Sequence, residues 1–274
     1  MRNMMWIGCW LALLLPQVAG AVSFHAVGST TVLPVISSAA VAFHRLHPDV
    51  QITVSGGGSG VGIASVIQHT ADLGMASREL DAAERAQLGD RVTVVTIAKD
   101  AVAVVVSKAV YVGGVHQLSL QQIADIYRGR IMNWRQVGGS DARIFVIDKE
   151  ASRGTRHVFA EAVLGSAHAR APGASVISGS NNEEQALVAH SDQAIGMLSN
   201  AWLNDAVRGV AVLVDGQPVL PDIAHVRDGS YPISRSLHLL LPRDAPQPLR
   251  DFVHFVLSPA GQAIVQHAGY LSVQ

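Results

Sequence analysis

The sequence predicts an α/β fold of two lobes, which are joined by two connecting strands and separated by a cleft. Short β-type runs alternate with helical patterns, which is typical of a mostly parallel sheet. This alternation occurs in two blocks along the 274 residues, enough chain for two domains of ordinary size. The end of the chain returns to the first block, so we assign residues 22–108 with 232–274 to lobe 1 and residues 109–231 to lobe 2.

The first block is expected to follow the order β-α-β-α-β. Pro34 fits the first turn of its first helix, and His47-Pro48-Asp49 ends that helix after about Leu46. Val92 to Val106 is almost continuously apolar, broken by Lys99-Asp100, and we interpret it as two buried strands joined by a crossing segment. The other expected elements are strands at Val22–Val27, 50–54 and Asp72–Ala76, and helices at Gly60–His69 and Leu80–Leu88.

The second block and the end of the chain continue the pattern. Ser119 is expected to cap a helix ahead of Leu120 and Ile123, and Ser258-Pro259 is expected to open the last helix. The remaining expected elements are strands at Arg143–Ile147, Ser175–Ser178, Ala194–Leu198 and Leu237–Leu241, a hairpin over Val210–Leu220, and helices at Val158–Leu164, Glu183–His190, Pro246–Leu257 and Pro259–His267.

Three segments of the first block share one form, a β-type run followed by glycine and hydroxyl residues. They lie at 28–34, 55–62 and 72–79, and a fourth corner of this kind follows at Lys149–Arg156. Glycine lets the backbone approach a ligand closely, and a helix N-terminus offers free N–H donors and a partial positive charge. Ligands of open α/β sheets bind beyond the carboxyl ends of the strands. These corners therefore predict a site for a small anion.

The first twenty residues differ from the rest and predict a signal peptide. Arg2 precedes an apolar run, Met4–Leu15, which is too short to span a bilayer comfortably. Small residues follow, so we expect cleavage after Gly20 or Ala21 and a periplasmic location. An N-terminal membrane anchor is the alternative, which the absence of a stop-transfer flank disfavours.

The single cysteine, Cys9, lies within this predicted signal peptide. Lipidation at Cys9 is disfavoured because the apolar run mostly follows the cysteine. The mature chain would then contain no disulfide, no thiol nucleophile and no cysteine-ligated metal.

The composition and motifs exclude several classes of function. The formal net charge is −1 and only 15% of the residues are charged. The sequence therefore lacks the basic stripe of a nucleic-acid-binding protein. The histidines form no His-Glu-x-x-His motif, and we interpret His44 and His47 as surface residues. Ser59 is not in a Gly-x-Ser-x-Gly motif because residue 61 is valine, and no Gly-Lys-Ser/Thr follows the glycine turn. We therefore expect no catalytic residues, metal or cofactor, and we expect a monomer.

Seven short segments, in their order and spacing, carry a resemblance. They are Gly28-Ser29-Thr30-Thr31-Val32-Leu33-Pro34, Ser55-Gly56-Gly57-Gly58-Ser59-Gly60-Val61-Gly62, Asp72-Leu73-Gly74-Met75-Ala76-Ser77-Arg78-Glu79, Ile126-Tyr127-Arg128-Gly129 with Asn133-Trp134, Gly154-Thr155-Arg156, Ala194-Ile195-Gly196 and Tyr231-Pro232-Ile233-Ser234-Arg235. With these segments the chain resembles the PstS-type phosphate-binding proteins of bacterial ABC importers. The resemblance implies a type II periplasmic binding protein fold, in which two α/β lobes hinge and close on one phosphate in the interlobe cleft.

The resemblance also implies which residues bind phosphate. The first turn, the glycine turn, the third segment and the second-lobe turn of the family correspond here to Ser29, Thr30, Thr31, Ser59, Ser77, Arg78, Lys149, Arg153, Gly154 and Thr155. Two of these are departures, since Lys149 and Arg153 stand where many members have an arginine and a serine. Either Arg78 or Arg153 is assigned the role of binding two phosphate oxygens at once, with Lys149 as a point charge.

A further departure concerns selectivity. Many members place an aspartate in the third segment, where it accepts a hydrogen bond from protonated phosphate and thereby rejects sulfate. That position falls on Ser77 or Arg78 here. We therefore hypothesise that Glu150 or Asp148 supplies the missing acceptor from the other lobe.

The function predicted from these observations is capture of inorganic phosphate in the periplasm and delivery to an ABC permease in the inner membrane. One alternative is the same fold binding another oxyanion, such as sulfate or arsenate. Another is a periplasmic sensor or surface protein that has kept the fold. A secreted phosphatase would need a nucleophile with a base, or metal ligands, and the sequence shows neither grouping.

Overall fold

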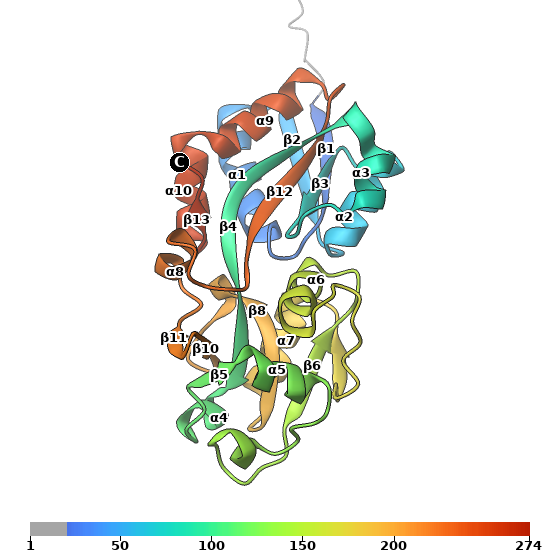
Figure 1. The fold of residues 1–274 in the computed structure, drawn as a ribbon. Coiled ribbons are helices and arrows are strands. Elements are labelled where there is room, and N and C mark those ends of the chain that lie inside the picture. The colour runs from blue at the N-terminus through green and yellow to red at the C-terminus, as the bar shows by residue number, and fades with distance from the viewer. Residues whose placement is uncertain (1–20) are drawn as a thin grey trace, which may run out of the picture.

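The computed structural model describes residues 21–274 and has two α/β lobes, one above the other (Figure 1). The predicted signal peptide, residues 1–20, lies outside the described residues. Both lobes share one long strand, β4 (Val92–Ser107), which runs from the upper lobe into the lower one. We call the upper lobe, built on strands β1–β3, lobe 1, and the lower lobe, built on strands β6–β8, lobe 2.

Lobe 1 has a mixed sheet in the strand order β2-β1-β3-β12-β4. The first three strands are parallel to one another, and β12 runs antiparallel to both β3 and β4. The strands are β1 (Val22–Gly28), β2 (Val50–Ser55), β3 (Leu73–Ala76) and β12 (Ser234–Pro242), and the helices are α1 (Leu33–Leu46), α2 (Ser59–Ile67), α3 (Ala82–Leu88), α9 (Gln247–Leu257) and α10 (Pro259–His267). The last two helices come from the end of the chain, as the sequence predicts.

Lobe 2 continues the sheet in the order β4-β8-β6-β7, and a second, three-stranded sheet has the order β11-β10-β5. Its strands are β5 (Gln117–Ser119), β6 (Phe145–Lys149), β7 (Val176–Ser178), β8 (Ala194–Ser199), β9 (Val207–Gly209), β10 (Ala211–Val214) and β11 (Gln217–Val219). Its helices are α4 (Lys108–Val112), α5 (Leu120–Tyr127), α6 (Gly154–Phe159), α7 (Asn181–Ala189) and α8 (Ile223–Arg227).

The expectation of two strands between Val92 and Val106 is wrong, because β4 is one continuous strand. Lys99-Asp100 does not interrupt it. The strand passes between lobes at this point, so its first half pairs with β12 and its second half with β8 and β9. Asp100 stays within the strand because its buried carboxylate is paired with Arg235 of β12.

The two largest hydrophobic clusters lie on either side of this crossing. Ile97 and Ala98 of β4 belong to the core of lobe 1, together with α1, α9 and α10, whereas Val102, Val104 and Val106 belong to that of lobe 2. The returning chain divides in the same way: Tyr231 and Ile233 pack in lobe 2, and Leu237 and Leu239 pack in lobe 1. The chain therefore crosses between the lobes twice, near Asp100 and near Arg235.

Several predicted element boundaries are corrected by the structure. The helix expected from Val158 begins at Gly154 as α6 and continues as a π-helical turn over Ala160–Leu164. The short elements α4, α8, β9 and β13 (Leu271–Ser272) were not expected. Ser119 caps α5 and Ser258 caps α10, which confirms both predicted caps.

Candidate functional site

The four predicted corners meet between the lobes, at the carboxyl ends of β1, β2, β3 and β6. Together they enclose a pocket of only about 10 Å³, close to the smallest volume that holds one water molecule. The pocket is lined by Ser29, Thr30, Thr31, Gly58, Ser59, Ser77, Lys149, Arg153, Gly154, Thr155, Gly179 and Asn181. Nine of the ten predicted site residues are thus brought together, and Arg78 is the exception.

The first corner needs a glycine at its start. Gly28 has a φ of +140°, and a Cβ there would lie 2.9 Å from the Cα of Gly62 in α2. This close approach lets Ser29 donate its N–H to Met75 O at the end of β3, at 2.9 Å. The Ser29 hydroxyl in turn accepts the Thr31 N–H at 3.2 Å, which fixes the turn around the pocket.

The second and third corners are locked to each other through two serines. Ser59 opens α2 after Gly57 and Gly58, both of which have positive φ. Its fully buried hydroxyl accepts the Ser77 N–H at 2.9 Å and lies 3.2 Å from the Ser77 hydroxyl. A helix N-terminus leaves its first N–H groups without partners inside the helix, and Ser59 at the start of α2 lines the pocket. Lobe 1 therefore presents hydroxyls and oriented N–H donors.

The corner of lobe 2 closes directly against these serines. The Gly60 N–H of lobe 1 donates to Ser152 O of lobe 2 at 3.0 Å. Gly154 packs so tightly that an added Cβ would lie 2.6 Å from the Ser77 hydroxyl and still closer to that of Ser59. This structure therefore has its lobes closed around the pocket.

Lys149 is a buried cation at the pocket with a buried counterion. Its ammonium forms an ion pair with Glu184 and donates to Ser180 O at 3.4 Å. Glu184 is fully buried and also accepts the Ser178 hydroxyl at 2.9 Å and the Met197 N–H. Burial lowers the pKa of Lys149 and raises that of Glu184, and the attraction between the two charges opposes both changes.

Arg153 lines the pocket, and its charge is also paired. Its aliphatic stem lies against Gly58 of lobe 1, where a Cβ would approach it to 2.8 Å. Its guanidinium donates to the half-exposed Glu150 carboxylate at 2.6 and 2.8 Å. Arg153 therefore contacts lobe 1 from lobe 2 at the edge of the pocket.

Arg235, which sequence reasoning missed as a site residue, links both lobes beside the pocket. It forms an ion pair with Asp100 and donates to Thr31 Oγ1 at 3.2 Å and to Ser77 O at 3.2 Å in lobe 1. It also donates to Thr155 Oγ1 of lobe 2 at 2.9 Å. Burial raises the pKa of Asp100, although Arg235 and the Ser199 hydroxyl pull it down. The only signal for Arg235 in the sequence is its position at the end of the Tyr231–Arg235 segment.

Asn181 was also missed, and its sequence context carries no signal for a binding role. It begins α7, is buried, and donates its side-chain N–H to Thr31 Oγ1 in the other lobe at 3.1 Å. Thr31 thus receives hydrogen bonds from Arg235 and Asn181 together, so it is the residue on which the two lobes converge.

Two predicted anion-facing groups are turned away from the pocket. The guanidinium of Arg78 makes two hydrogen bonds of 2.7 Å to Glu84, so its charge is used in a salt bridge within lobe 1. Asp148 is paired with Arg156 at 2.6 Å and accepts the Lys149 N–H. Neither Asp148 nor Glu150 lines the pocket, so the structure does not support either as the missing acceptor.

The Arg78–Glu84 pair predicts an effect of acid on stability. Burial acts to raise the pKa of Glu84, but hydrogen bonds from Arg78 and from the Asp81 N–H outweigh it, so the pKa lies below its ordinary value of 4.5. The stabilisation is therefore present above 4.5 and is lost as the pH falls through the lower folded-state value. Glu84→Gln should make the free energy of unfolding, measured by urea denaturation, less dependent on pH in this range. The exposed Glu161→Gln is the control, and an unchanged slope in Glu84→Gln would refute the prediction.

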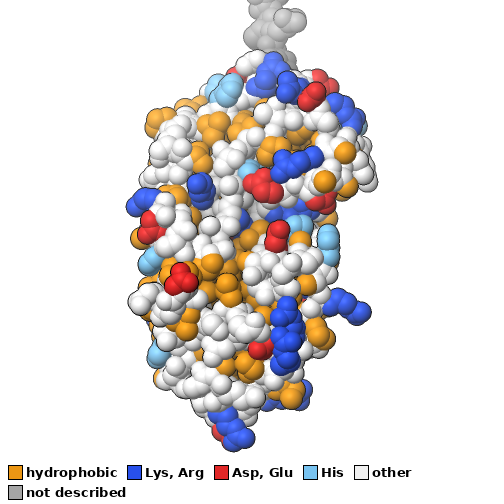
Figure 2. Space-filling model, in the orientation of Figure 1, with side chains coloured by type: hydrophobic (Ala, Val, Ile, Leu, Met, Phe, Trp, Pro, Cys, Tyr) orange, Lys and Arg blue, Asp and Glu red, His pale blue; other side chains and the backbone are white. Residues whose placement is uncertain are grey.

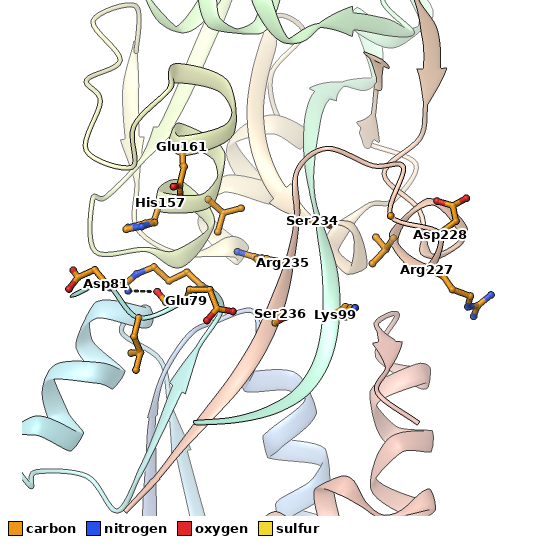
Figure 3. Close-up of a pocket in the computed structure, with 15 residues that line it drawn as sticks. Glu79, Asp81, Lys99, His157, Glu161, Arg227, Asp228, Ser234, Arg235 and Ser236 are labelled. Atoms are coloured by element: carbon orange, nitrogen blue, oxygen red, sulfur yellow. Dashed lines mark hydrogen bonds between the residues drawn. The ribbon is translucent and has the colours of Figure 1, made fainter. Parts of the chain in front are cut away.

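A second, larger hollow of about 670 Å³ lies beside the pocket between the lobes. Figure 3 shows Arg235 reaching from β12 toward lobe 2, with His157 and Glu161 on the opposite wall. Charged side chains of both signs line it, including Lys99, Arg227 and Asp228. Figure 2 likewise shows basic and acidic side chains interspersed over this face of the molecule. Mixed charge makes this hollow a poor match for a small dianion compared with the enclosed pocket.

Residues 21–274 contain no helix with both the length and the apolar character that a membrane crossing requires. The same residues contain no group of three or more histidine, cysteine, aspartate or glutamate side chains arranged to hold a metal ion.

The fold and the enclosed pocket between two lobes define a solute-binding protein with a type II periplasmic binding fold. The PBP superfamily domain matches residues 16–260 of the chain. The chain is 30% identical over 250 residues to the phosphate-binding protein PstS of Bacillus subtilis, covering 90% of this chain and 79% of that protein. It is 26% identical to the PstS of Borreliella burgdorferi, covering 90% and 88%. The chain belongs to the PstS phosphate-binding protein family, which confirms the predicted fold and family.

Solved structures agree with this assignment. A candidate phosphate ABC transporter substrate-binding protein from Clostridium perfringens, solved with bound phosphate, is 34% identical with a TM-score of 0.84, covering 92% of this chain and all of that one. An ABC-type phosphate transport receptor from Vibrio cholerae is 30% identical with a TM-score of 0.73, covering 90% and 99%. The two-lobe arrangement described above is thus shared with structures of clearly similar sequence.

Proposed function

We propose that this protein captures inorganic phosphate between its two lobes and delivers it to an ABC importer. The observation that carries the proposal is the small pocket lined from both lobes by hydroxyls, N–H donors and the cations Lys149 and Arg153. A pocket this small has no room for the organic part of a phosphate ester. The relatives named as phosphate-binding proteins support phosphate as the ligand.

The proposed binding relies on dipoles more than on net charge. Each cation at the pocket has a carboxylate partner: Lys149 with Glu184, Arg153 with Glu150, and Arg235 with Asp100. Hydroxyls and N–H groups therefore supply most of the attraction, through short hydrogen bonds to the phosphate oxygens. Both lobes contribute donors, so a bound anion stabilises the closed arrangement over an open one.

The two crossings between the lobes are proposed as the hinge of this closure. β4 and the segment entering β12 connect the lobes near Asp100 and Arg235. Opening about these strands would separate the Gly60–Ser152 contact and admit the anion. A permease in the inner membrane would then distinguish closed from open protein. The predicted signal peptide, periplasmic location and monomeric state belong to the same proposal.

The proposal includes no catalysis. The family is one of substrate-binding proteins, and the residues that line the pocket include no histidine to act as a base. The buried hydroxyls of Ser59 and Thr155 are held by protein N–H donors rather than by a base. A phosphatase role therefore finds no support in the described part of the chain.

Loss of single pocket hydroxyls should weaken phosphate binding. Ser59→Ala and Thr155→Val should each lower the affinity by roughly 5- to 150-fold, because one buried hydrogen bond to the anion is removed at a cost of about 1–3 kcal/mol. Isothermal titration of protein stripped of anion gives the affinities. The exposed Ser38→Ala of α1 is the matched control and should bind as the unmodified protein does. Absence of phosphate binding to the unmodified protein would refute the proposed function.

A further inference from the structure

We infer that the pocket recognises the tetrahedral shape and the acceptor oxygens of an oxyanion and not its proton. Unprotonated dianions of the sulfate class therefore bind with an affinity within about tenfold of that for phosphate. The inference rests on the proposed function and extends it to the class of anion accepted. It follows from which atoms of the pocket can accept a hydrogen bond.

No carboxylate lines the pocket among the described residues. A carboxylate facing the ligand would accept the proton of hydrogen phosphate, and it would repel an anion that offers only lone pairs. Three carboxylates that do not line the pocket, Glu184, Glu150 and Asp100, are instead paired with Lys149, Arg153 and Arg235. The usual means of rejecting sulfate is therefore missing.

The hydroxyl on which the lobes converge has its lone pairs occupied. Thr31 Oγ1 accepts from Asn181 Nδ2 at 3.1 Å and from Arg235 Nη2 at 3.2 Å. A hydroxyl has two acceptor lone pairs and one hydrogen. In this arrangement Thr31 can offer a ligand only its hydrogen, as a donor.

Other hydroxyls and carbonyls at the pocket also accept hydrogen bonds from the protein. The hydroxyls of Ser29, Ser59 and Thr155 each accept a hydrogen bond from a protein N–H or guanidinium group. The carbonyls of Ser29 and Ser77 accept from the Leu33 N–H and from Arg235. A hydroxyl that already accepts a hydrogen bond from the protein can still donate its hydrogen to a ligand, which favours ligands that present acceptor oxygens.

The pocket also has neutral acceptors that fit either form of the anion, among them the half-buried hydroxyl of Thr30 and the side-chain oxygen of Asn181. A half-turn of the Asn181 amide exchanges its oxygen and nitrogen, because the Thr31 hydroxyl can donate as well as accept. Asn181 can therefore face a protonated or an unprotonated oxygen, and it is the residue we assign as setting this tolerance.

Titration of the unmodified protein with phosphate and with sulfate, at about pH 6 and about pH 8, tests the inference. Sulfate has no proton at either pH, so it reports any change in the protein itself. We expect sulfate to bind within about tenfold of phosphate at the higher pH. We also expect the affinity for phosphate, relative to sulfate, to rise with pH as phosphate loses its second proton.

Asn181→Asp tests the assigned residue, since it puts a carboxylate in nearly the same shape. Sulfate affinity should fall by roughly 5- to 150-fold more than phosphate affinity, because only hydrogen phosphate can donate to the new acceptor. Asn182→Asp, an exposed neighbour in α7 with the same change of charge, should leave the ratio of the two affinities unchanged.

The outcomes separate the inference from the proposed function. Phosphate binding with sulfate more than about tenfold weaker at the higher pH would overturn the inference and leave phosphate capture standing. An unchanged affinity ratio in Asn181→Asp would overturn the assignment of Asn181. Absence of binding by either anion would instead refute the proposed function itself.

Discussion

Replacing Arg235 with methionine should destabilise the protein by about 3–5 kcal/mol, because it leaves the fully buried Asp100 without its counterion. The same change removes the donor that holds Thr31, Ser77 and Thr155 in position from both sides of the cleft. Phosphate affinity should therefore fall by more than about tenfold. Urea denaturation and isothermal titration measure the two effects.

The loss of stability in Arg235→Met should depend on pH. Burial already raises the pKa of Asp100, and without the guanidinium it rises further. The folded variant then keeps a proton that the unfolded chain releases, so its free energy of unfolding decreases as the pH rises above 3.8, toward the raised folded-state value. The variant should accordingly be less stable at neutral pH than in mild acid.

A double variant separates the charge from the geometry. Arg235→Met combined with Asp100→Asn removes both charges and keeps an acceptor for the Ser199 hydroxyl. It should recover most of the stability but not the binding. The exposed Arg243→Met, just beyond β12, is the control and should change neither. Full stability in the single variant would contradict the structural role given to Arg235.

Gly154→Ala should abolish closure while leaving each lobe folded. The added Cβ would lie 2.6 Å from the Ser77 hydroxyl and closer to that of Ser59, both in the opposite lobe. A real Cβ does not tolerate such contacts, and both serines are buried and fixed by hydrogen bonds. The lobes must part to relieve the overlap, so phosphate affinity should fall by more than about a hundredfold, as bonds from several donors are lost together.

Gly165→Ala provides the opposite pattern of effects. Gly165 has a φ of +84° and open space where a Cβ would lie, so alanine there costs about 1–2 kcal/mol of backbone strain without touching the cleft. We expect a lower melting temperature with unchanged affinity for Gly165→Ala, and a nearly unchanged melting temperature with lost affinity for Gly154→Ala. Wild-type affinity in Gly154→Ala would show that binding does not need the closed contact.

Local patterns were sufficient to predict most of the fold and much of the site. Alternating β-type and helical runs located the parallel strands of lobe 1, and glycine with hydroxyl residues marked the corners that line the pocket. Corner residues are predictable because their chemistry is local: Gly28 is needed for a backbone conformation, and Ser59 stands at the first residue of a helix.

Long-range pairing explains what the sequence did not predict. Lys99-Asp100 looked like a break in β4 because a charge in an apolar run suggests a loop, and only the partner 135 residues away makes it a buried strand residue. Arg78 and Arg235 both stand beside small residues. The guanidinium of Arg78 is paired with Glu84, which lies six residues further along the chain. Asn181 contacts Thr31 across 150 residues, a distance over which no local pattern carries information.

The crystal structure of the phosphate complex tests the central claim most directly. We predict one phosphate enclosed between the lobes, within hydrogen-bond distance of Thr31 and Ser59 of lobe 1 and of Lys149 and Thr155 of lobe 2. Phosphate bound by one lobe alone, or in the larger hollow beside Lys99 and Arg227, would contradict it.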